Sequence, residues 1–213
     1  MTHRATVTIG PKRPKVLSLF SGAGGLDFGL EAAGFSTAVA LDIDADACTT
    51  LRGNRHWPVI ENCVHEVEPA ELLTCAKVRR GEVALLAGGP PCQPFSKSSY
   101  WKHGESGRLA DPRAQTLAAY LRIVEETLPQ AFLLENVHGL AYAKADEGLQ
   151  LLLDGIERIN KRTRARYTPA MKVLDAANYG VPQHRKRFVL IALRDGLEFS
   201  FPEATHGPGL RPW

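Results

Sequence analysis

The sequence has few of the features that mark secreted, metal-binding or membrane proteins. It contains four cysteines and no Cys-x-x-Cys pair, so it indicates neither a disulfide framework nor a zinc site. Such cysteine usage is typical of a reducing compartment, and we expect a cytoplasmic protein, nucleoid-associated in a bacterium, that needs no metal. No apolar run approaches the length that spans a bilayer, and the first residues lack the apolar core of a signal peptide. We therefore expect neither export nor a membrane partner.

An excess of one charge is also missing. The chain has 26 Lys and Arg against 23 Asp and Glu, and the net charge of +3 is too small to indicate nucleic-acid binding by itself. There are no internal repeats and no low-complexity tracts. With 213 residues, 44% hydrophobic and 23% charged, the chain is long enough for one domain with a sizeable core. Residues 1–14 are polar with one glycine and two prolines, which predicts a flexible N-terminal arm.

The most informative stretch is GGPPCQPFS, from Gly88 to Ser96. It follows the apolar run Val83–Ala87, which predicts a buried strand. Two glycines allow a sharp turn and two prolines exclude helix, so we expect Cys92 on a rigid, extended elbow at the strand's carboxyl end. Folds of the α/β class bind ligands at this edge of the sheet. The plain alternative, a Pro/Gly turn with one buried free cysteine, leaves most of the nonapeptide unexplained.

A second unit near the start of the chain predicts a nucleotide-type cofactor site. Val16–Phe20 reads as a strand, SGAGG as a tight turn, and Leu26, Leu30 and Ala33 recur at helical spacing. Small residues let a backbone approach a ligand, and amides at a helix N-terminus face it. The GxGxxG spacing of dinucleotide folds is absent, so a glycine turn without a ligand stays open as an alternative.

The next predicted strand, Thr37–Leu41, ends in two carboxylates with different expected roles. Asp42 follows the glycine turn by about 20 residues, the spacing that suits hydrogen bonding to ribose hydroxyls. Asp44 is predicted to cap the N-terminus of a helix over Ala45–Arg52.

Further along the chain, strands and helices continue to alternate. Ala131–Leu134 is a predicted strand that delivers Glu135 and Asn136 at its carboxyl end, where the carboxyl group can converge with Cys92. Alternation along a strand predicts that Gln183, Arg185 and Arg187 share one face. Three more helices are predicted: one over Glu71–Arg80, one that Asp111 caps and that has Pro112 at its first position, and one over Asp146–Arg162. Two more strands are predicted over Met171–Leu174 and Arg187–Leu193.

Taken in order, these stretches resemble the motifs of the cytosine-C5 DNA methyltransferases. The resemblance rests on GGPPCQPFS together with the glycine turn, the Asp42 position, ENV and QxRxR after YGVP, and it covers Lys15 to Pro208. It implies an α/β fold of the Rossmann-like, S-adenosylmethionine-dependent methyltransferase type. Such a fold has a mostly parallel central sheet, helices on both faces and a late antiparallel strand.

The resemblance also implies an organisation and partners. Residues 15–200 would form the catalytic and cofactor-binding domain, and residues 201–213 a C-terminal linker, with the target-recognition domain absent. We therefore expect either the catalytic half of a split enzyme or a fragment of a longer chain. Its partners would be double-stranded DNA and a second protein subunit that carries the recognition domain and the C-terminal motifs.

The resemblance assigns roles residue by residue. The catalytic positions are Cys92, Glu135, Arg185 and Arg187. The positions for S-adenosylmethionine, which leaves as S-adenosylhomocysteine, are Phe20, Ser21, Gly22, Ala23, Gly25, Asp42, Ile43, Cys63, Pro91 and Thr116. The positions toward the substrate base and DNA are Gln93, Ser96, Asn136 and Gln183. Two positions depart from the family, which usually has Glu in place of Asp42 and Asp in place of Cys63.

The implied reaction begins with a thiolate. Cys92 adds to C6 of a flipped-out cytosine, so that C5 becomes nucleophilic enough to take a methyl group. Glu135 binds N3 and the exocyclic amine, and Arg185 holds the base carbonyl, supported by Arg187. Release of the C5 proton to a base then frees the cysteine.

Two other functions stay open. An RNA cytosine methyltransferase that acts on tRNA shares these motifs, and comparison of tRNA with duplex DNA as methyl acceptor separates the two. A catalytically inactive regulatory module would keep the fold, but it has no need of a nucleophile such as Cys92. An adenine N6 methyltransferase would need an Asn/Asp-Pro-Pro-aromatic motif, which the sequence lacks.

Overall fold

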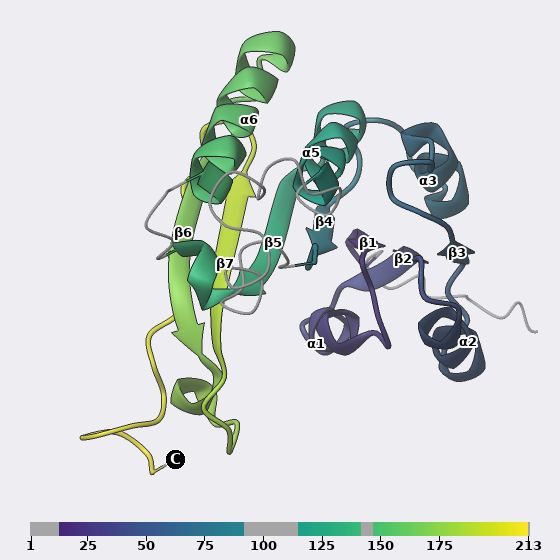
Figure 1. Ribbon diagram of the computed structural model, residues 1–213. Coiled ribbons are helices and arrows are strands. Elements are labelled where there is room, and N and C mark those ends of the chain that lie inside the picture. Colours follow the sequence, from purple (N-terminus) through teal and green to yellow (C-terminus); the bar gives the residue numbers. More distant parts are fainter. Residues whose placement is uncertain (1–12, 92–114, 142–146, 213) are drawn as a thin grey trace, which may run out of the picture.

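The computed structural model describes residues 13–91, 115–141 and 147–212. Strands and helices alternate along the chain, as the hydrophobic pattern predicts (Figure 1). The strands are β1 (Lys15–Leu19), β2 (Ser36–Asp42), β3 (Val59–Glu61), β4 (Leu85–Gly88), β5 (Ala131–Val137), β6 (Thr168–Asp175) and β7 (Lys186–Leu193). The α-helices are α1 (Gly25–Ala32), α2 (Ala45–Asn54), α3 (Pro69–Ala76), α5 (Gln115–Thr127) and α6 (Glu147–Thr163), with short 3-10 turns η1 (His138–Ala141) and η2 (Ala176–Tyr179).

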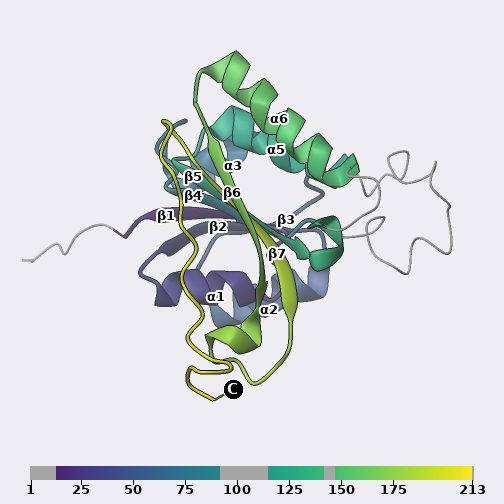
Figure 2. The ribbon, with the colours of Figure 1, turned by 90° about the vertical axis from the view of Figure 1, so that its left-hand side faces the viewer.

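These strands form one seven-stranded sheet in the order β3-β2-β1-β4-β5-β7-β6. All neighbouring pairs from β3 to β5 are parallel, whereas β7 runs antiparallel to both β5 and β6. Helices α1 and α2 cover one face, and α3, α5 and α6 cover the other (Figure 2). The predicted fold class, with its late antiparallel strand, is therefore confirmed.

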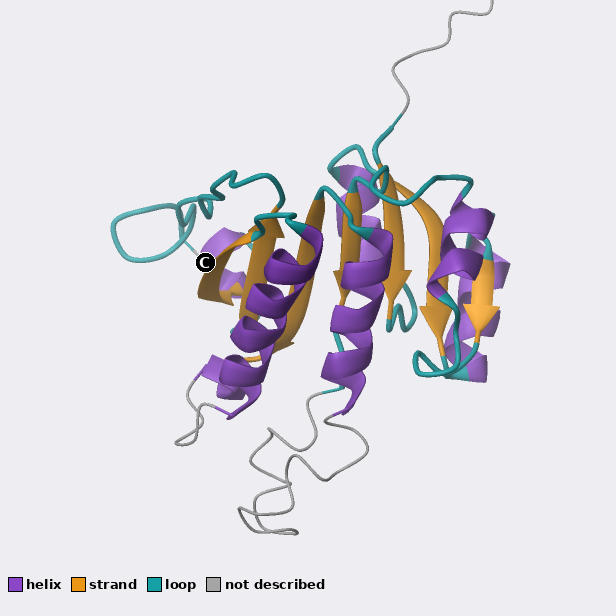
Figure 3. Cartoon of the chain, turned by 90° about the horizontal axis from the view of Figure 1, so that it is seen from above, coloured by secondary structure: helices purple, strands orange, loops and turns teal. Residues whose placement is uncertain are grey.

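The strand order places the ends of β1 and β4 side by side. From β1 the chain proceeds outward to β2 and β3, and it then returns to build β4 and β5 on the other side of β1. Helices consequently lie in front of and behind the strands (Figure 3). The crevice beside such a reversal of strand order, at the carboxyl ends of the strands, is where open α/β sheets bind ligands.

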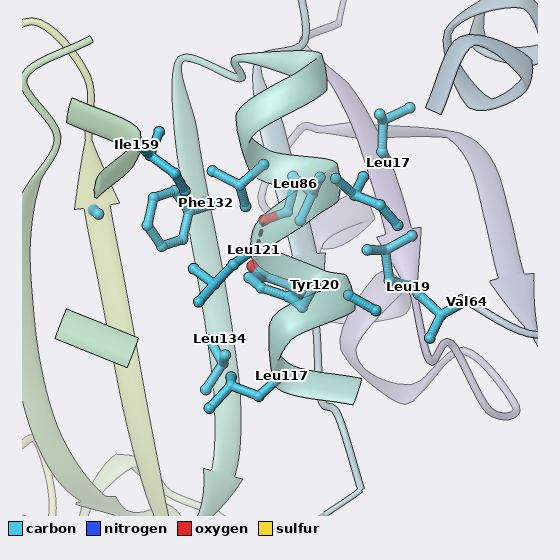
Figure 4. Close-up of a cluster of buried hydrophobic side chains, with 14 of the residues drawn as sticks. Leu17, Leu19, Val64, Leu86, Leu117, Tyr120, Leu121, Phe132, Leu134 and Ile159 are labelled. Atoms are coloured by element: carbon cyan, nitrogen blue, oxygen red, sulfur yellow. Dashed lines mark hydrogen bonds between the residues drawn. The ribbon is translucent and has the colours of Figure 1, made fainter. Parts of the chain in front are cut away.

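The core beneath this edge is built on α5. Tyr120 is fully buried, and its hydroxyl donates to the carbonyl oxygen of Leu133 at 2.8 Å, with that of Leu86 at 3.4 Å (Figure 4). Phe132 packs edge-on against Tyr120. Leu117, Leu121 and Val124 of α5 are all buried. Deep burial of α5 against β4 and β5 fixes the positions of both strand ends at the crevice.

Several boundaries differ from those that the sequence predicts. Helix α3 begins at Pro69 and ends at Ala76, because Lys77 turns left-handed (φ 52°) and Lys15 Nζ donates to the carbonyl oxygens of Ala76 and Lys77. Strand β6 is longer than predicted and includes Pro169, which is tolerated because β6 lies at the edge of the sheet. The predicted cap at Asp111 and Pro112, and Asp146 at the start of α6, lie outside the described residues.

Helix α1 buries a carboxyl side chain in its first turn. Leu26 is 37% exposed and Ala33 is exposed, while Asp27 is buried. Asp27 faces hydroxyl groups of β1 and β2, while Leu30 is half-buried against the core around Val16.

After β7 the chain returns along the molecule toward η2 (Figure 2). The backbone amides of Thr205 and His206 donate to the carbonyl oxygen of Asn178 at 2.9 and 3.0 Å. The Tyr179 hydroxyl donates to the Pro202 carbonyl oxygen at 3.1 Å. The described part of the segment after residue 200 is thus attached to the β6–β7 connection. Among the described helices, none is long and apolar enough to cross a membrane.

Candidate active site

The glycine-rich turn after β1 is held in an unusual backbone conformation. Phe20 (φ 54°), Gly22 (φ 52°) and Gly24 (φ 87°) are all left-handed. The Ser21 amide donates to the Leu41 carbonyl oxygen at 3.1 Å, which fastens the turn to the end of β2. Gly24 precedes α1, and a Cβ built on it would lie 2.9 Å from Leu51 Cδ2. Gly24 is therefore required both by its backbone conformation and by the close approach of α2.

Asp42, at the end of β2, closes this turn from the other side. Its Oδ2 accepts a hydrogen bond from the Gly22 amide at 2.7 Å, and its Oδ1 accepts one from the Asp44 amide at 2.9 Å. A carboxylate has about four lone-pair sites, so each oxygen can accept a further hydrogen bond. Asp44 caps α2, with its Oδ1 accepting from the Ala47 amide at 2.7 Å, which confirms the capping role predicted for it.

A small cavity of about 100 Å³ opens between these elements and the end of β4. Most of its lining is apolar, and the one carboxylate in the lining is that of Asp42. The lining residues are Phe20, Leu41, Asp42, Ile43, Asn62, Cys63, Val64, Pro91 and Thr116. Six of them are predicted cofactor positions, drawn from five separate segments of the sequence. The other four predicted positions, Ser21, Gly22, Ala23 and Gly25, form the adjacent turn and the start of α1.

The elbow after β4 lies against the end of β5. Gly89 packs on Glu135, since a Cβ built on Gly89 would lie 3.0 Å from Glu135 Oε2. Asn136 is 5% exposed, and its Nδ2 donates to the Pro90 carbonyl oxygen at 3.1 Å. Asn136, expected to contact substrate, thus lies beneath the elbow and supports it.

Glu135 forms an ion pair across the β5–β7 boundary. Arg187 Nε lies 2.8 Å from Glu135 Oε1, and both side chains are about one-third exposed (27% and 32%). The pair forms because Glu135 is opposite Val189 in the antiparallel register, which places Arg187 near the same end of the two strands. The structure therefore brings together two of the four predicted catalytic side chains.

The segment that carries Gln183 and Arg185 is a connection rather than a strand. Strand β7 begins at Lys186, so the alternation predicted for Gln183, Arg185 and Arg187 was wrong for the first two. The Arg185 side chain is exposed, while its amide donates to Asp175 Oδ1 at 2.9 Å. Asp175, at the end of β6, fixes the start and finish of this connection.

Asp175 has three hydrogen-bonding partners. Besides the Arg185 amide, it interacts with His184 Nδ1 at 3.1 Å and accepts from the Ala177 amide at 3.3 Å. Desolvation alone would raise the pKa of Asp175, but the hydrogen bonds from His184 and the two amides outweigh it and lower that pKa. The ionised carboxylate is thus the form that holds the connection together.

Three of the predicted site residues, Cys92, Gln93 and Ser96, lie outside the described residues. Three others that contribute to this edge were not predicted: Asp27, Asn62 and Asp175. A lone acidic residue in an otherwise apolar first helical turn is a sequence signal for Asp27. Within the described ranges, no group of three or more His, Cys, Asp or Glu side chains is arranged to hold a metal ion.

Comparison with known proteins identifies the family. The profile of the C-5 cytosine-specific DNA methylases matches residues 14–208. Type II methyltransferase M.AquIA of Picosynechococcus sp. is 42% identical over 197 residues, which cover 91% of this chain and 77% of that protein. The chain belongs to the C-5 cytosine-specific DNA methylase family.

Other C-5 cytosine-specific DNA methylase relatives are longer. Type II methyltransferase M.SacI of Streptomyces achromogenes is 41% identical over 204 residues, covering 90% of this chain. The chain spans only 50% of the length of M.SacI and 48% of M1.HphI of Haemophilus parahaemolyticus. The region described above is therefore one part of those proteins.

Solved structures agree with the fold of this C-5 cytosine-specific DNA methylase. A prophage-encoded E. coli protein, described as a DNA modification methyltransferase, has a TM-score of 0.70 and 27% identity over 87% of this chain and 49% of its own. The S. pombe Dnmt2 methyltransferase has a TM-score of 0.64 at 23% identity, over 89% of this chain and 52% of its own. The second likeness concerns the fold alone.

Proposed function

We propose that this chain transfers a methyl group from S-adenosylmethionine to C5 of cytosine in duplex DNA. One observation carries the proposal: Pro91, the residue directly before Cys92, lines the same cavity as Phe20 and Asp42. A nucleophile that follows Pro91 is therefore joined in sequence to the cavity wall. Methyl transfer needs such an arrangement, because the attacking base and the methyl donor must be held close together.

The lining of the cavity suits one part of S-adenosylmethionine. Phe20, Ile43 and Val64 offer apolar surface to a flat purine, and the Asp42 oxygens retain lone pairs for ribose hydroxyls. About 100 Å³ is below the ~300–1,000 Å³ of sites for whole ligands, so the rest of an extended cofactor would lie along the open edge. When bound, the cofactor supplies an electrophilic methyl group.

Cys63 and Asn62 together replace an adenine-binding carboxylate in this proposal. Both residues line the cavity, and Asn62 Oδ1 already accepts the Cys63 amide at 2.7 Å. Asn62 Oδ1 keeps a second lone pair that can accept from the adenine amino group, its amide nitrogen can donate to a ring nitrogen, and the thiol of Cys63 adds a soft apolar surface.

The roles proposed at the target cytosine follow from the Glu135–Arg187 ion pair and from the elbow after β4. The Cys92 thiolate adds to C6, which makes C5 nucleophilic. Glu135 accepts from the exocyclic amine and shares a proton with N3, and Arg187 orients its carboxyl group through the 2.8 Å contact. Arg185, whose side chain is exposed, would hold the base carbonyl oxygen, with Gln183, Gln93 and Ser96 toward the DNA. The target must leave the base stack, since these groups cannot reach C6 within a duplex.

A covalent trap tests the nucleophile. With S-adenosylmethionine present, duplex DNA containing 5-fluorocytosine should form a denaturation-resistant complex with this chain, because after methyl transfer C5 carries fluorine in place of the proton whose loss would free the cysteine. The Cys92→Ser variant should form none. Cys75→Ser is the matched control, since Cys75 is a half-buried thiol in α3 remote from the cavity lining, and it should trap normally. A complex that survives Cys92→Ser would show that another residue attacks.

We also propose that a separate polypeptide supplies the choice of DNA sequence. The support is the variation in length among relatives, in which the matching region makes up 77% of M.AquIA and 50% of M.SacI. Family members thus differ widely in how much chain accompanies the catalytic region. Alone, this chain should methylate DNA weakly and without sequence preference. Efficient methylation of one sequence by this chain alone would contradict the proposal. We propose a cytoplasmic location, because the proposed substrate is DNA.

A further inference from the structure

A buried relay of hydrogen bonds runs beneath the glycine-rich turn. Asp27, which is 1% exposed in the first turn of α1, accepts hydrogen bonds from the Ser18 hydroxyl at 3.0 Å and the Thr37 hydroxyl at 3.1 Å. The Ser18 oxygen lies 2.9 Å from the Ser21 hydroxyl. All four side chains are buried. The relay therefore connects α1, β1 and β2 to one residue of the turn.

The chemistry of the carboxylate sets the direction of the relay. An ionised carboxylate only accepts, so Ser18 donates to Asp27 and its own oxygen is left to accept from Ser21. Burial raises the pKa of Asp27, while the hydrogen bonds from Ser18 and Thr37 oppose that rise. Thr37 binds the other oxygen of the carboxylate and has no link to the turn through these contacts. Of the two hydroxyls that bind Asp27, that of Ser18 therefore also contacts the turn, through Ser21, and that of Thr37 does not.

The turn held by the relay is strained. Phe20 is left-handed, a conformation that is unfavourable for a residue with a Cβ and persists where neighbouring contacts impose it. Ser21, the next residue, is fixed by its amide, which donates to the Leu41 carbonyl oxygen, and by its hydroxyl. The hydroxyl lies 2.9 Å from Ser18 Oγ, its shortest contact, and 3.3 Å from the carbonyl oxygens of Ser18 and Leu41. Phe20 itself lines the cavity.

We infer that Asp27 is a positioning residue for the cofactor site, acting through Ser18 and Ser21 to hold Phe20 in the conformation that lines the cavity. The inference rests on the proposed function, since it takes this cavity to hold part of S-adenosylmethionine. Asp27 touches no cavity surface itself; its effect is on the geometry of the turn.

Two variants of matched chemistry test the inference. Ser18→Ala and Thr37→Val each remove one buried hydroxyl that donates to Asp27, and only the first breaks the link to Ser21. Calorimetric titration with S-adenosylhomocysteine should show at least fivefold weaker binding for Ser18→Ala and less than twofold for Thr37→Val. Denaturant unfolding should show similar losses of stability for the two. The KM for S-adenosylmethionine should rise in Ser18→Ala with kcat at saturation unchanged.

Asp27→Asn provides a second route if Ser18→Ala fails to fold. It keeps the size of the side chain but offers one oxygen acceptor in place of two, so it should also weaken binding of S-adenosylhomocysteine several-fold. Equal affinities for Ser18→Ala and Thr37→Val, or an Asp27→Asn chain that binds like the unmodified one, would overturn the inference alone. No binding by the unmodified chain would overturn the proposed function and this inference with it.

Discussion

Replacement of Asn136 distinguishes a residue that supports the elbow from one that contacts DNA. Asn136 is buried and makes two hydrogen bonds, from its Nδ2 to the Pro90 carbonyl oxygen and from the Val137 amide to its Oδ1. Asn136→Ala removes both and leaves the carbonyl oxygen beneath the elbow without this donor. The unfolding free energy should fall by about 1–3 kcal/mol, the cost of leaving buried polar groups unpaired.

The effect on catalysis should appear in the rate rather than in DNA affinity. A loosened elbow shifts Pro90 and Pro91, the residues that precede the proposed nucleophile. Each 1.4 kcal/mol of lost transition-state stabilisation is about a tenfold fall in kcat. Asn136→Asp sharpens the test, because it keeps the acceptor for the Val137 amide and turns only the group facing Pro90 into an acceptor. Steady-state kinetics should show kcat reduced about tenfold or more in both variants, with the KM for DNA unchanged. A raised KM for DNA at normal kcat would refute the reasoning and support direct contact with substrate.

Two further predictions concern the turn and the β6–β7 connection. Gly24→Ala should lower the unfolding free energy by about 1–2 kcal/mol or more, because Gly24 has a left-handed φ and a Cβ there would meet Leu51. Gly29→Ala is the control: it lies in an open part of α1 and should raise the unfolding free energy by up to about 1 kcal/mol. Equal effects of the two variants in thermal unfolding would contradict this account. The pKa of Asp175 is lowered in the folded chain from its ordinary value of 3.8. Its contribution to the unfolding free energy is therefore fully present above pH 3.8 and is lost as the pH falls through the lower, folded-state pKa. The stability difference between the unmodified chain and Asp175→Asn should therefore shrink on acidification through this window, and a difference that does not change with pH would exclude the role of the ionised carboxylate.

The sequence predicted the strand ends at the site better than it predicted the contacts between them. Phe20, Asp42 and Pro91 were assigned as cofactor positions by resemblance, and the structure places all three in the lining of one cavity. Asp27 was not predicted: its acidic side chain in an apolar helical turn is a local signal, but its contacts depend on hydroxyl groups of two strands that α1 covers only in the folded chain.

Two other differences have equally specific causes. Arg185 was assigned to a strand face because its neighbours alternate, but the Asp175 hydrogen bonds keep Gln183–Arg185 in a connection. Helix α3 ends early because Lys15, far away in sequence, donates to its last carbonyl oxygens. Contacts between distant residues determine both features, and local periodicity carries no information about them.

The position of the transferred methyl group is the most direct test of the account. The chain, alone and with the product of the adjacent reading frame, should be incubated with methyl-labelled S-adenosylmethionine and either duplex DNA or tRNA, and the acceptor digested to nucleosides. The account predicts label in 5-methyldeoxycytidine from DNA, lost in Cys92→Ser and retained in Cys75→Ser. Label on adenine, label in tRNA alone, transfer that persists in Cys92→Ser, or no label in any mixture would contradict it.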